Sequence, residues 1–403
     1  MSVRIALVAA CPFPSPQGSQ VFVGGMAAGL AARGHEVHLL TYGQGHEVSD
    51  QGYRHHRLRR LWGDDALRSG PSLTKPLLDV MMASRLYGLV RKLGIEVIHA
   101  HNYEAAVAAL AVGRLLAVPV VYHSHNLMVD ELPSYFARGF SRAIARRVGS
   151  LLDRSVPRRA DHAIALCDYT AAALRDSGVS ARRLSVIPPA VSVVGPRGSM
   201  ARARGRLGIE PDAAVVGYCG NLDGYQNMDL LLQAMAALRT RNRSRPANLL
   251  IVTHVADPGF ERAVAAAGLA GVVRVEVADG FSAARRGLEA ADVVVLPRRK
   301  GSGYPIKLIN YMAMAMPIVT AGCGGKILDD GVDALVVGDD DAVALATAIE
   351  SLLEDPGRAL RLGDGAWRHY MQSLTWEAVL PAIEGVYHEV LTAGARSTAP
   401  STL

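Results

Sequence analysis

The chain has few cysteines, few aromatic residues and no long uninterrupted hydrophobic run. Its four cysteines (Cys11, Cys167, Cys219 and Cys323) include no Cys-x-x-Cys pair. Neither a common structural zinc site nor a disulfide framework follows from this spacing, and a reducing compartment fits it best. We therefore expect a cytoplasmic protein.

Membrane-crossing and secretory segments are also missing from the pattern. The longest apolar stretch, residues 105–122, is interrupted by Arg114 and Pro119, so a helix followed by a buried strand explains it better than a membrane span. The first apolar run ends at Pro12 and has no basic leader, which predicts a buried first strand instead of a signal peptide.

The charge of the chain is moderately basic, with a formal net value of +6, and arginines concentrate in residues 138–159. Two explanations stay open for this stretch: a solvated helix face, or a patch that associates weakly with an anionic membrane surface. Aromatic residues make up only 5% of the chain, so we expect no nucleic-acid partner. The abundance of alanine and arginine is typical of a bacterium with a GC-rich genome. Nothing in the pattern indicates an oligomeric state.

Short apolar runs alternate with amphipathic stretches along nearly all of the 403 residues. Continuous apolar strands separated by helices predict parallel sheets covered on both faces. A Pro-, Gly- and Ser-rich segment at 188–199 reads as a linker. We therefore predict an α/β protein with two Rossmann-like domains, 1–190 and 191–375, whose parallel sheets face each other across a cleft. Residues 393–403 are predicted to be a disordered tail.

In open α/β sheets, ligands bind beyond the carboxyl ends of the strands. The first loop in such a place ends at Gly18 and Ser19, directly before a predicted helix whose backbone N–H groups can face an anion. A plain strand–helix turn explains the loop equally well. The Gly-x-Gly-x-x-Gly fingerprint of dinucleotide sites and the phosphate-binding Gly-x-x-x-x-Gly-Lys-Ser/Thr motif are both absent.

Four histidines follow two predicted strands: His99, His101, His123 and His125. The spacing of two puts each pair on one face of its strand. A metal site, a hydrogen-bonding wall for a polyhydroxylated ligand, and satisfied core residues are all readings of this pattern. The wall is favoured because no carboxylate or cysteine completes a recognisable ligand set. We expect no metal and no cofactor.

The strongest motif is the segment 296–320, LPRRKGSGYPIKLINYMAMAMPIVT. A strand is followed by a basic glycine-containing loop, and Pro305 stands where the first turn of a helix begins. Backbone amides of Tyr304, Ile306 and Lys307 and the cations of Arg298, Arg299 and Lys300 would suit a diphosphate. A basic surface turn is the alternative.

With this motif the sequence resembles the family 4 retaining glycosyltransferases of the GT-B fold, and the resemblance covers nearly the whole chain. The similar segments are PFPSPQGSQ with GLAARGHEVHLLT, ADHAIALCDYTAAAL, RLSVIPPAV, VVGYCGNLDGYQNMDLLLQAM and the segment 291–319. The resemblance implies a donor nucleotide held by the second domain and an acceptor held by the first. It also implies that the helix 376–392 crosses back to the first domain.

The resemblance departs from the family at the donor motif, where two glutamates usually stand with seven residues between them. Here these positions are Ser302 and Asn310, and the usual arginine and lysine of the second domain correspond to Asn221 and Gln226. The chain is similar to a branch with Tyr-Gln after a glycine and a Lys-Leu-x-Asn-Tyr-Met segment. The resemblance assigns three sets of site residues: catalytic His125, Arg298 and Lys307; donor-binding Gly18, Ser19, Asn221, Ser302, Gly303, Tyr304, Pro305, Ile306 and Asn310; acceptor-side His101, His123, Asn126 and Glu131.

We therefore expect a metal-independent, retaining glycosyltransferase that moves a sugar from a UDP- or GDP-linked donor to a small-molecule or glycan acceptor. Two alternatives stay open. One is a non-catalytic nucleotide-sugar-binding protein, suggested by the missing glutamates. The other is a sugar-nucleotide epimerase or phosphorylase of the same fold.

Overall fold

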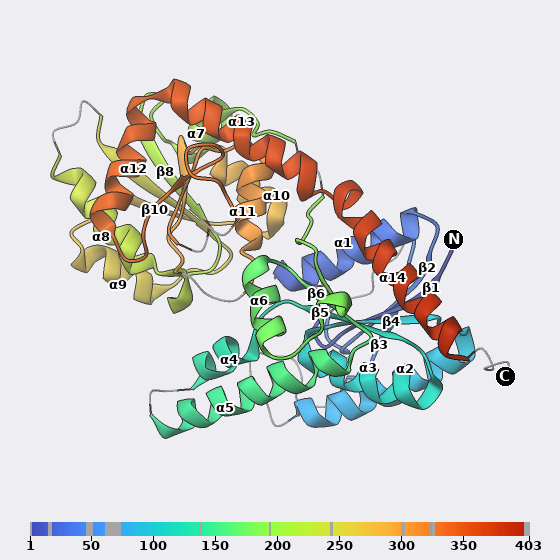
Figure 1. Cartoon of the computed structure of the whole chain (residues 1–403). Helices are drawn as coiled ribbons and strands as arrows, with labels where there is room; N and C mark the ends of the chain where they lie inside the picture. The colour runs from blue at the N-terminus through green and yellow to red at the C-terminus, as the bar shows by residue number, and fades with distance from the viewer. Residues whose placement is uncertain are drawn as a thin grey trace. The chain divides into compact units, whose positions relative to one another are not determined.

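A computed structural model describes residues 2–14, 18–45, 51–60, 74–136, 139–192, 195–241, 245–299, 303–322, 324 and 327–398. The chain forms two compact units (Figure 1). The first comprises Met1–Ser192, Ser302–Tyr304 and Trp376–Leu403. The second comprises Val193–Gly301 and Pro305–Thr375.

The first unit is built on a parallel sheet of seven described strands in the order β3-β2-β1-β4-β5-β6-β7. Their bounds are β1 Arg4–Ala9, β2 Glu36–Thr41, β3 Arg54–Arg57, β4 Val97–His101, β5 Val120–Ser124, β6 His162–Ala165 and β7 Leu184–Val186. The helices of this unit are α1 Gly18–Ala32, α2 Lys75–Leu93, α3 Asn102–Leu116, α4 Met128–Glu131, α5 Phe140–Ser155, α6 Asp168–Asp176 and α14 Trp376–Thr398. The predicted parallel sheet is therefore confirmed.

Alternate side chains of β1 enter two different cores, as the period of two in a strand requires. Ala6 and Val8 pack with α2 and α3, whereas Ile5 and Leu7 pack with α1 and α14. Two glycines of α1 allow α14 to lie close against it. A Cβ atom on Gly25 would come within 2.6 Å of the Trp376 ring, and one on Gly29 within 2.7 Å of Leu380.

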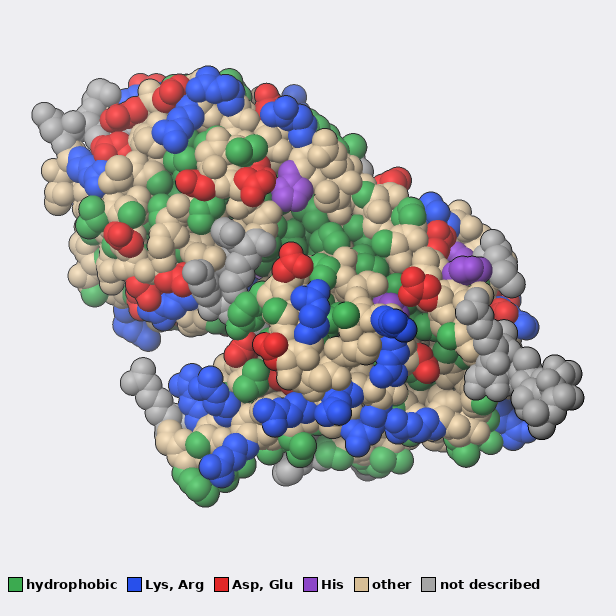
Figure 2. Space-filling model, in the orientation of Figure 1, with side chains coloured by type: hydrophobic (Ala, Val, Ile, Leu, Met, Phe, Trp, Pro, Cys, Tyr) green, Lys and Arg blue, Asp and Glu red, His purple; other side chains and the backbone are tan. Residues whose placement is uncertain are grey.

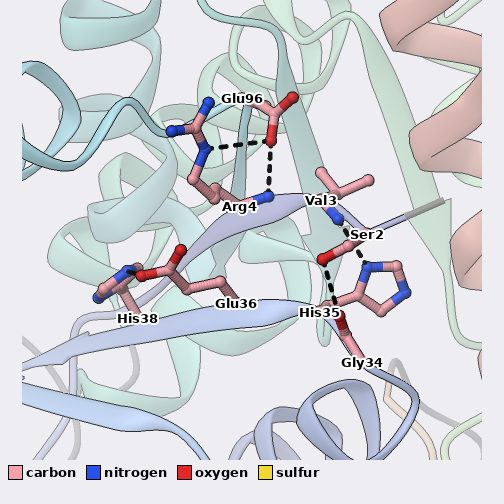
Figure 3. Close-up of polar contacts among 8 residues, drawn as sticks. All are labelled: Ser2, Val3, Arg4, Gly34, His35, Glu36, His38 and Glu96. Carbon is pink, nitrogen blue, oxygen red and sulfur yellow. Dashed lines mark hydrogen bonds and ion pairs between the residues drawn. The ribbon is translucent and has the colours of Figure 1, made fainter.

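The amino ends of the central strands are tied together by polar contacts (Figure 3). The backbone N–H of Arg4 donates to Glu96 at 2.8 Å, and its guanidinium donates to the same carboxylate at 3.4 Å. The hydroxyl of Ser2 donates to the carbonyl of Gly34 at 2.7 Å. Because the strands are parallel, all their carboxyl ends lie at the opposite end of the sheet. The loops that are predicted to bind ligands follow these carboxyl ends.

The second unit contains a parallel sheet of six described strands in the order β10-β9-β8-β11-β12-β13. The strands are β8 Ala214–Cys219, β9 Ala247–Thr253, β10 Val273–Val277, β11 Val293–Leu296, β12 Ile318–Thr320 and β13 Leu335–Val336. The helices are α7 Met200–Leu207, α8 Met228–Arg239, α9 Pro258–Ala266, α10 Gly280–Leu288, α11 Ile306–Ala313, α12 Ala342–Glu354 and α13 Pro356–Ser373.

One boundary prediction is wrong. Helix α14 continues to Thr398, so residues 393–398 are helical and not the start of a disordered tail. The segment 391–398 holds alanines and no proline, and an established helix extends more easily than a new one nucleates. Residues 399–403 lie outside the described part of the chain.

Candidate functional site

The first unit gathers the four predicted histidines at the ends of β4 and β5. The register of the two strands places His101 directly opposite His123. Ring nitrogens then meet in two pairs: His99 Nε2 lies 3.1 Å from His123 Nδ1, and His101 Nδ1 lies 3.0 Å from His125 Nε2. The ring centroids of His99 and His101 lie 4.7 Å apart and those of His123 and His125 5.3 Å apart, so each pair lies on one side of the sheet, although β5 ends at Ser124, before His125. Immediately afterwards, Asn102 adopts φ +69°, a left-handed turn that leads from β4 into α3.

Aromatic side chains of α1 and α14 cover the histidines. The Phe22 ring packs edge-on against His123 and His125, with centroids 5.3 and 5.5 Å apart, and stacks on Trp376. From α14, the Tyr387 hydroxyl contacts His99 Nδ1 at 2.6 Å. His101 and His123 have no exposed surface, and their assignment to the acceptor side stays a prediction. His125 keeps 7% of its surface exposed.

Burial makes these imidazoles neutral at physiological pH. It lowers the pKa of His99 to about 3 and that of His125 to about 4. It also lowers the pKa of His101 and His123 well below the ordinary value, and neighbouring histidines add to the effect. A neutral imidazole has one donor and one acceptor nitrogen, which fits the paired contacts. His125 can therefore offer a hydrogen bond to a ligand, but not a positive charge.

Among the described residues, three of these histidines lie close enough together to hold a metal ion. One ring nitrogen each from His99, His101 and His123 lies within 4.8 Å of the others. The ring planes of His99 and His123 are only 7° apart, and their facing nitrogens are at the distance of an N–H···N hydrogen bond. Among the described residues, Nε2 of His101 and Nε2 of His123 have no hydrogen-bond partner. The expected absence of a metal stays a prediction.

Three further predicted residues lie together next to His125. The Asn126 amide donates to Glu131 at 3.0 Å, and the other Glu131 oxygen accepts from the Tyr135 hydroxyl at 2.9 Å. Gly303 adopts φ +85°, and a Cβ there would come within 2.0 Å of the Asn126 oxygen. Only glycine fits this place. Tyr304 packs against the core that contains α1 and α14.

The second unit builds a polar cluster around Lys307, in the first turn of α11. Its ammonium donates to the Tyr218 hydroxyl at 2.6 Å and to the Gln226 side-chain oxygen at 2.8 Å. The Gln226 amide donates in turn to Asn221 at 2.7 Å. These two acceptors are neutral groups, and the contacts fix the position of the ammonium. Gly220 adopts φ +143°, a conformation that favours glycine, and a Cβ there would lie 2.5 Å from the ammonium.

Two arginines after β11 have partners that the sequence did not reveal. The Arg298 guanidinium lies over the Tyr225 ring, 5.3 Å from its centroid. Arg299 forms an ion pair with Asp340 at 2.6 Å, and Asp340 also accepts from Asn227. Sequence reasoning missed Tyr218 and Tyr225 as members of the cluster, although the Tyr-Gln pair after Gly224 was a usable signal.

The remaining predicted residues of the described chain lie in helices α11 and α1 or at their starts. Pro305 is the N-cap of α11 and not its first helical residue, and Ile306 begins the helix. Asn310, in the second turn of α11, is half-buried. Gly18 and Ser19 are the first two residues of α1 and not the end of the preceding loop. Lys300 and Ser302 lie outside the described residues.

Two parallel α/β domains in one chain are the architecture of the GT-B fold. The family model described as Glycosyltransferase Family 4 matches residues 16–195. The one described as Glycosyl transferases group 1 matches residues 213–355. The chain belongs to the family 4 glycosyltransferases, in agreement with the resemblance.

Two bacterial relatives have similar lengths. The chain is 28% identical to a D-inositol 3-phosphate glycosyltransferase of Kineococcus radiotolerans, over 96% of this chain and 95% of the relative. It is 27% identical to the protein of the same name from Thermomonospora curvata, over 96% and 92% of the two chains.

Solved structures agree with the fold. Sucrose-phosphate synthase from Thermosynechococcus elongatus has a TM-score of 0.81 at 21% identity, covering 97% of this chain and 100% of that one. Anabaena HepE in complex with UDP has a TM-score of 0.76 at 16% identity, covering 96% and 100%.

Proposed function

We propose that this protein is a retaining, metal-independent glycosyltransferase that uses a nucleotide diphosphate sugar. One observation carries the proposal: the Lys307 ammonium is held by Tyr218 and Gln226 at the start of α11. The N-terminus of a helix favours anions, and a fixed cation adds to this field. A diphosphate is the anion that such a donor would bring.

The chemistry in this proposal is mainly charge stabilisation. As the bond between the sugar and the diphosphate breaks, negative charge grows on the leaving oxygen, and Arg298, the Lys307 ammonium and the backbone amides of Ile306 and Lys307 stabilise it. The acceptor hydroxyl attacks from the face that the diphosphate leaves, and its proton passes to a phosphate oxygen. The new bond therefore has the configuration of the old one.

His125 has a positioning role in this scheme. Because burial lowers its pKa to about 4, it is a neutral hydrogen-bonding group, and His101 contacts its Nε2 at 3.0 Å. We assign it the orientation of the sugar or of a phosphate oxygen. Asn310 would bind the ribose, because an amide offers both a donor and an acceptor to the two hydroxyls.

The relatives and solved structures indicate which donors and acceptors to test first. Anabaena HepE has been solved with UDP and with UDP-glucose, which makes UDP-sugars the first donors to test, with GDP-sugars next. The relatives named D-inositol 3-phosphate glycosyltransferases make phosphorylated polyols the first acceptors to test. Asn126 and Glu131, which hydrogen-bond to each other just after His125, would contact the acceptor hydroxyls.

A non-catalytic nucleotide-sugar-binding protein is the second candidate. It is favoured by one feature of the sequence, the replacement of both family glutamates by Ser302 and Asn310. An epimerase or phosphorylase of the same fold would differ in its co-substrate, because an epimerase needs no acceptor and a phosphorylase needs free phosphate.

The experiment begins with a thermal-shift panel of UDP-, GDP-, TDP- and ADP-sugars, because a ligand raises the stability of the state that binds it. The stabilising donor is then incubated with candidate acceptors, and the anomeric configuration of the product is read by NMR. Transfer with retained configuration is expected. Donor binding without transfer or hydrolysis would favour the binding protein, and transfer with inverted configuration would refute the mechanism.

A further inference from the structure

Helix α5 in the first unit exposes a stripe of large hydrophobic side chains. Phe140, Ile144, Val148 and Leu151 are spaced by four, four and three residues, which places them on one helix face. All four are exposed, with Phe140 at 83% and Leu151 at 65%. Isolated exposed apolar residues are ordinary in soluble proteins, but four along one helix face form a contiguous patch.

The opposite face of α5 is packed, which fixes the direction of the stripe. Gly149 lies directly on the backbone of α4, since a Cβ there would come within 2.3 Å of the Met128 carbonyl oxygen. The buried Asp153 carboxylate accepts from the backbone N–H groups of Met128 and Val129, both at 2.9 Å. The stripe therefore faces away from α4 and from the core.

The charges beside the stripe have a single sign. Between residues 140 and 159 the one acidic side chain is the buried Asp153, and the exposed charged groups are Arg142, Arg146, Arg147, Arg154, Arg158 and Arg159. Arg147 follows Ile144 by three residues, and Arg154 follows Leu151 by three, so these two border the stripe. Figure 2 shows the row of basic side chains along this side of the first unit.

We propose that α5 docks the first unit onto an anionic membrane surface, with the stripe inserted among the lipids and the arginines at the phosphate level. An apolar face bordered by cations is the pattern of a helix that lies in the plane of a bilayer interface. The arginines match the negative charge of such a surface. Among the described residues no helix is long and apolar enough to cross a membrane, so the contact is one of lying on the surface.

A second copy of the chain fits this surface less well. A twofold contact through the stripe would bring the same arginines of two copies together, and like charges at an interface are unfavourable. A nucleic acid would be attracted by the arginines, but the stripe would stay exposed in that complex. The membrane surface satisfies both features at once.

The test is co-flotation of the full-length protein with lipid vesicles. Vesicles of phosphatidylcholine in which roughly one lipid in three is anionic phosphatidylglycerol are compared with vesicles of phosphatidylcholine alone. Binding to the anionic vesicles is expected, and it should weaken as salt is raised. Leu151→Ser should lower the partition coefficient roughly tenfold through lost apolar burial. Arg147→Glu should lower it by more than the roughly fivefold expected for losing one cation near the surface.

Matched controls come from α3 of the same unit. Leu115 is 71% exposed, and Leu115→Ser with Arg114→Glu repeats the chemical changes away from the stripe and should leave flotation unchanged. All replaced side chains are exposed, so thermal melts of the variants should match the parent. Absence of flotation at low salt would overturn the proposal, as would equal loss in the α3 controls. A dimer that Leu151→Ser disrupts, without vesicle binding, would reassign the stripe to a second copy.

Discussion

The replacement of Lys307 by methionine tests the donor site most directly. Methionine keeps a similar length and can keep the contact with the Tyr218 ring, whose centroid lies 4.5 Å from the ammonium. It removes the charge and the bonds to Tyr218 and Gln226. If Lys307 binds the diphosphate, the variant should lose one charge-assisted contact, worth roughly 1.5–3 kcal/mol. That loss corresponds to roughly a 10- to 150-fold rise in the Kd of UDP.

The assay is isothermal titration calorimetry with UDP, a UDP-sugar and uridine. UDP and the UDP-sugar should weaken together, while uridine, which has no phosphate, should bind as before. Tyr218→Phe keeps the charge but removes a hydroxyl that positions it, so its effect should be smaller. Lys92→Ala removes an exposed lysine of α2 and serves as the control for net charge. Equal weakening of uridine and UDP by Lys307→Met would refute the assignment.

Three further outcomes are expected. Transfer activity should persist after dialysis against EDTA, and loss of activity that manganese restores would show a metal requirement. Asn310→Ala should weaken the binding of uridine itself by roughly 0.5–1.5 kcal/mol, the value of one hydrogen bond, whereas the Asn310→Glu variant should bind uridine at least as well as the parent protein. If calorimetry finds the binding of uridine unaffected by either change, Asn310 does not belong to the ribose site. Since burial lowers the pKa of His99 to about 3 and of His125 to about 4, the unfolded chain binds protons below pH 6.5 that the folded chain does not. The free energy of unfolding should therefore be highest above pH 6.5 and fall toward pH 4 by about 1.4 kcal/mol per pH unit for each histidine. Urea titrations should show a smaller slope for His125→Asn. The exposed control His254→Gln should leave the slope unchanged.

Much of the fold followed from local pattern. The alternation of apolar runs with amphipathic stretches predicted both parallel sheets, because buried parallel strands are continuous apolar runs and helices bring apolar residues to one face every three to four residues. Strand β3 was missed. Its sequence, Arg-His-His-Arg, is polar because it lies at the edge of the sheet and is only half buried.

The candidate site was harder to predict, because its contacts join residues far apart in the sequence. The motif of α11 located Lys307, but its bond to Gln226 spans 81 positions. The four histidines were found, yet their burial depends on Phe22 and on Trp376 and Tyr387, near the other end of the chain. A spacing of two places side chains on a face; it does not say which helix covers that face.

The close fit of α14 against α1 has a consequence for biosynthesis. Gly25 and Gly29 are translated before the whole second unit, and their partners Trp376 and Leu380 are translated after it. Domains generally fold as units in the order of synthesis. Here the apolar side of the first sheet that holds Ile5 is covered by α1 alone, without α14, until after the second unit has been translated. During that interval the nascent chain presents a hydrophobic surface of the kind that chaperones bind, and this surface is closed when α14 has been made and packs against it.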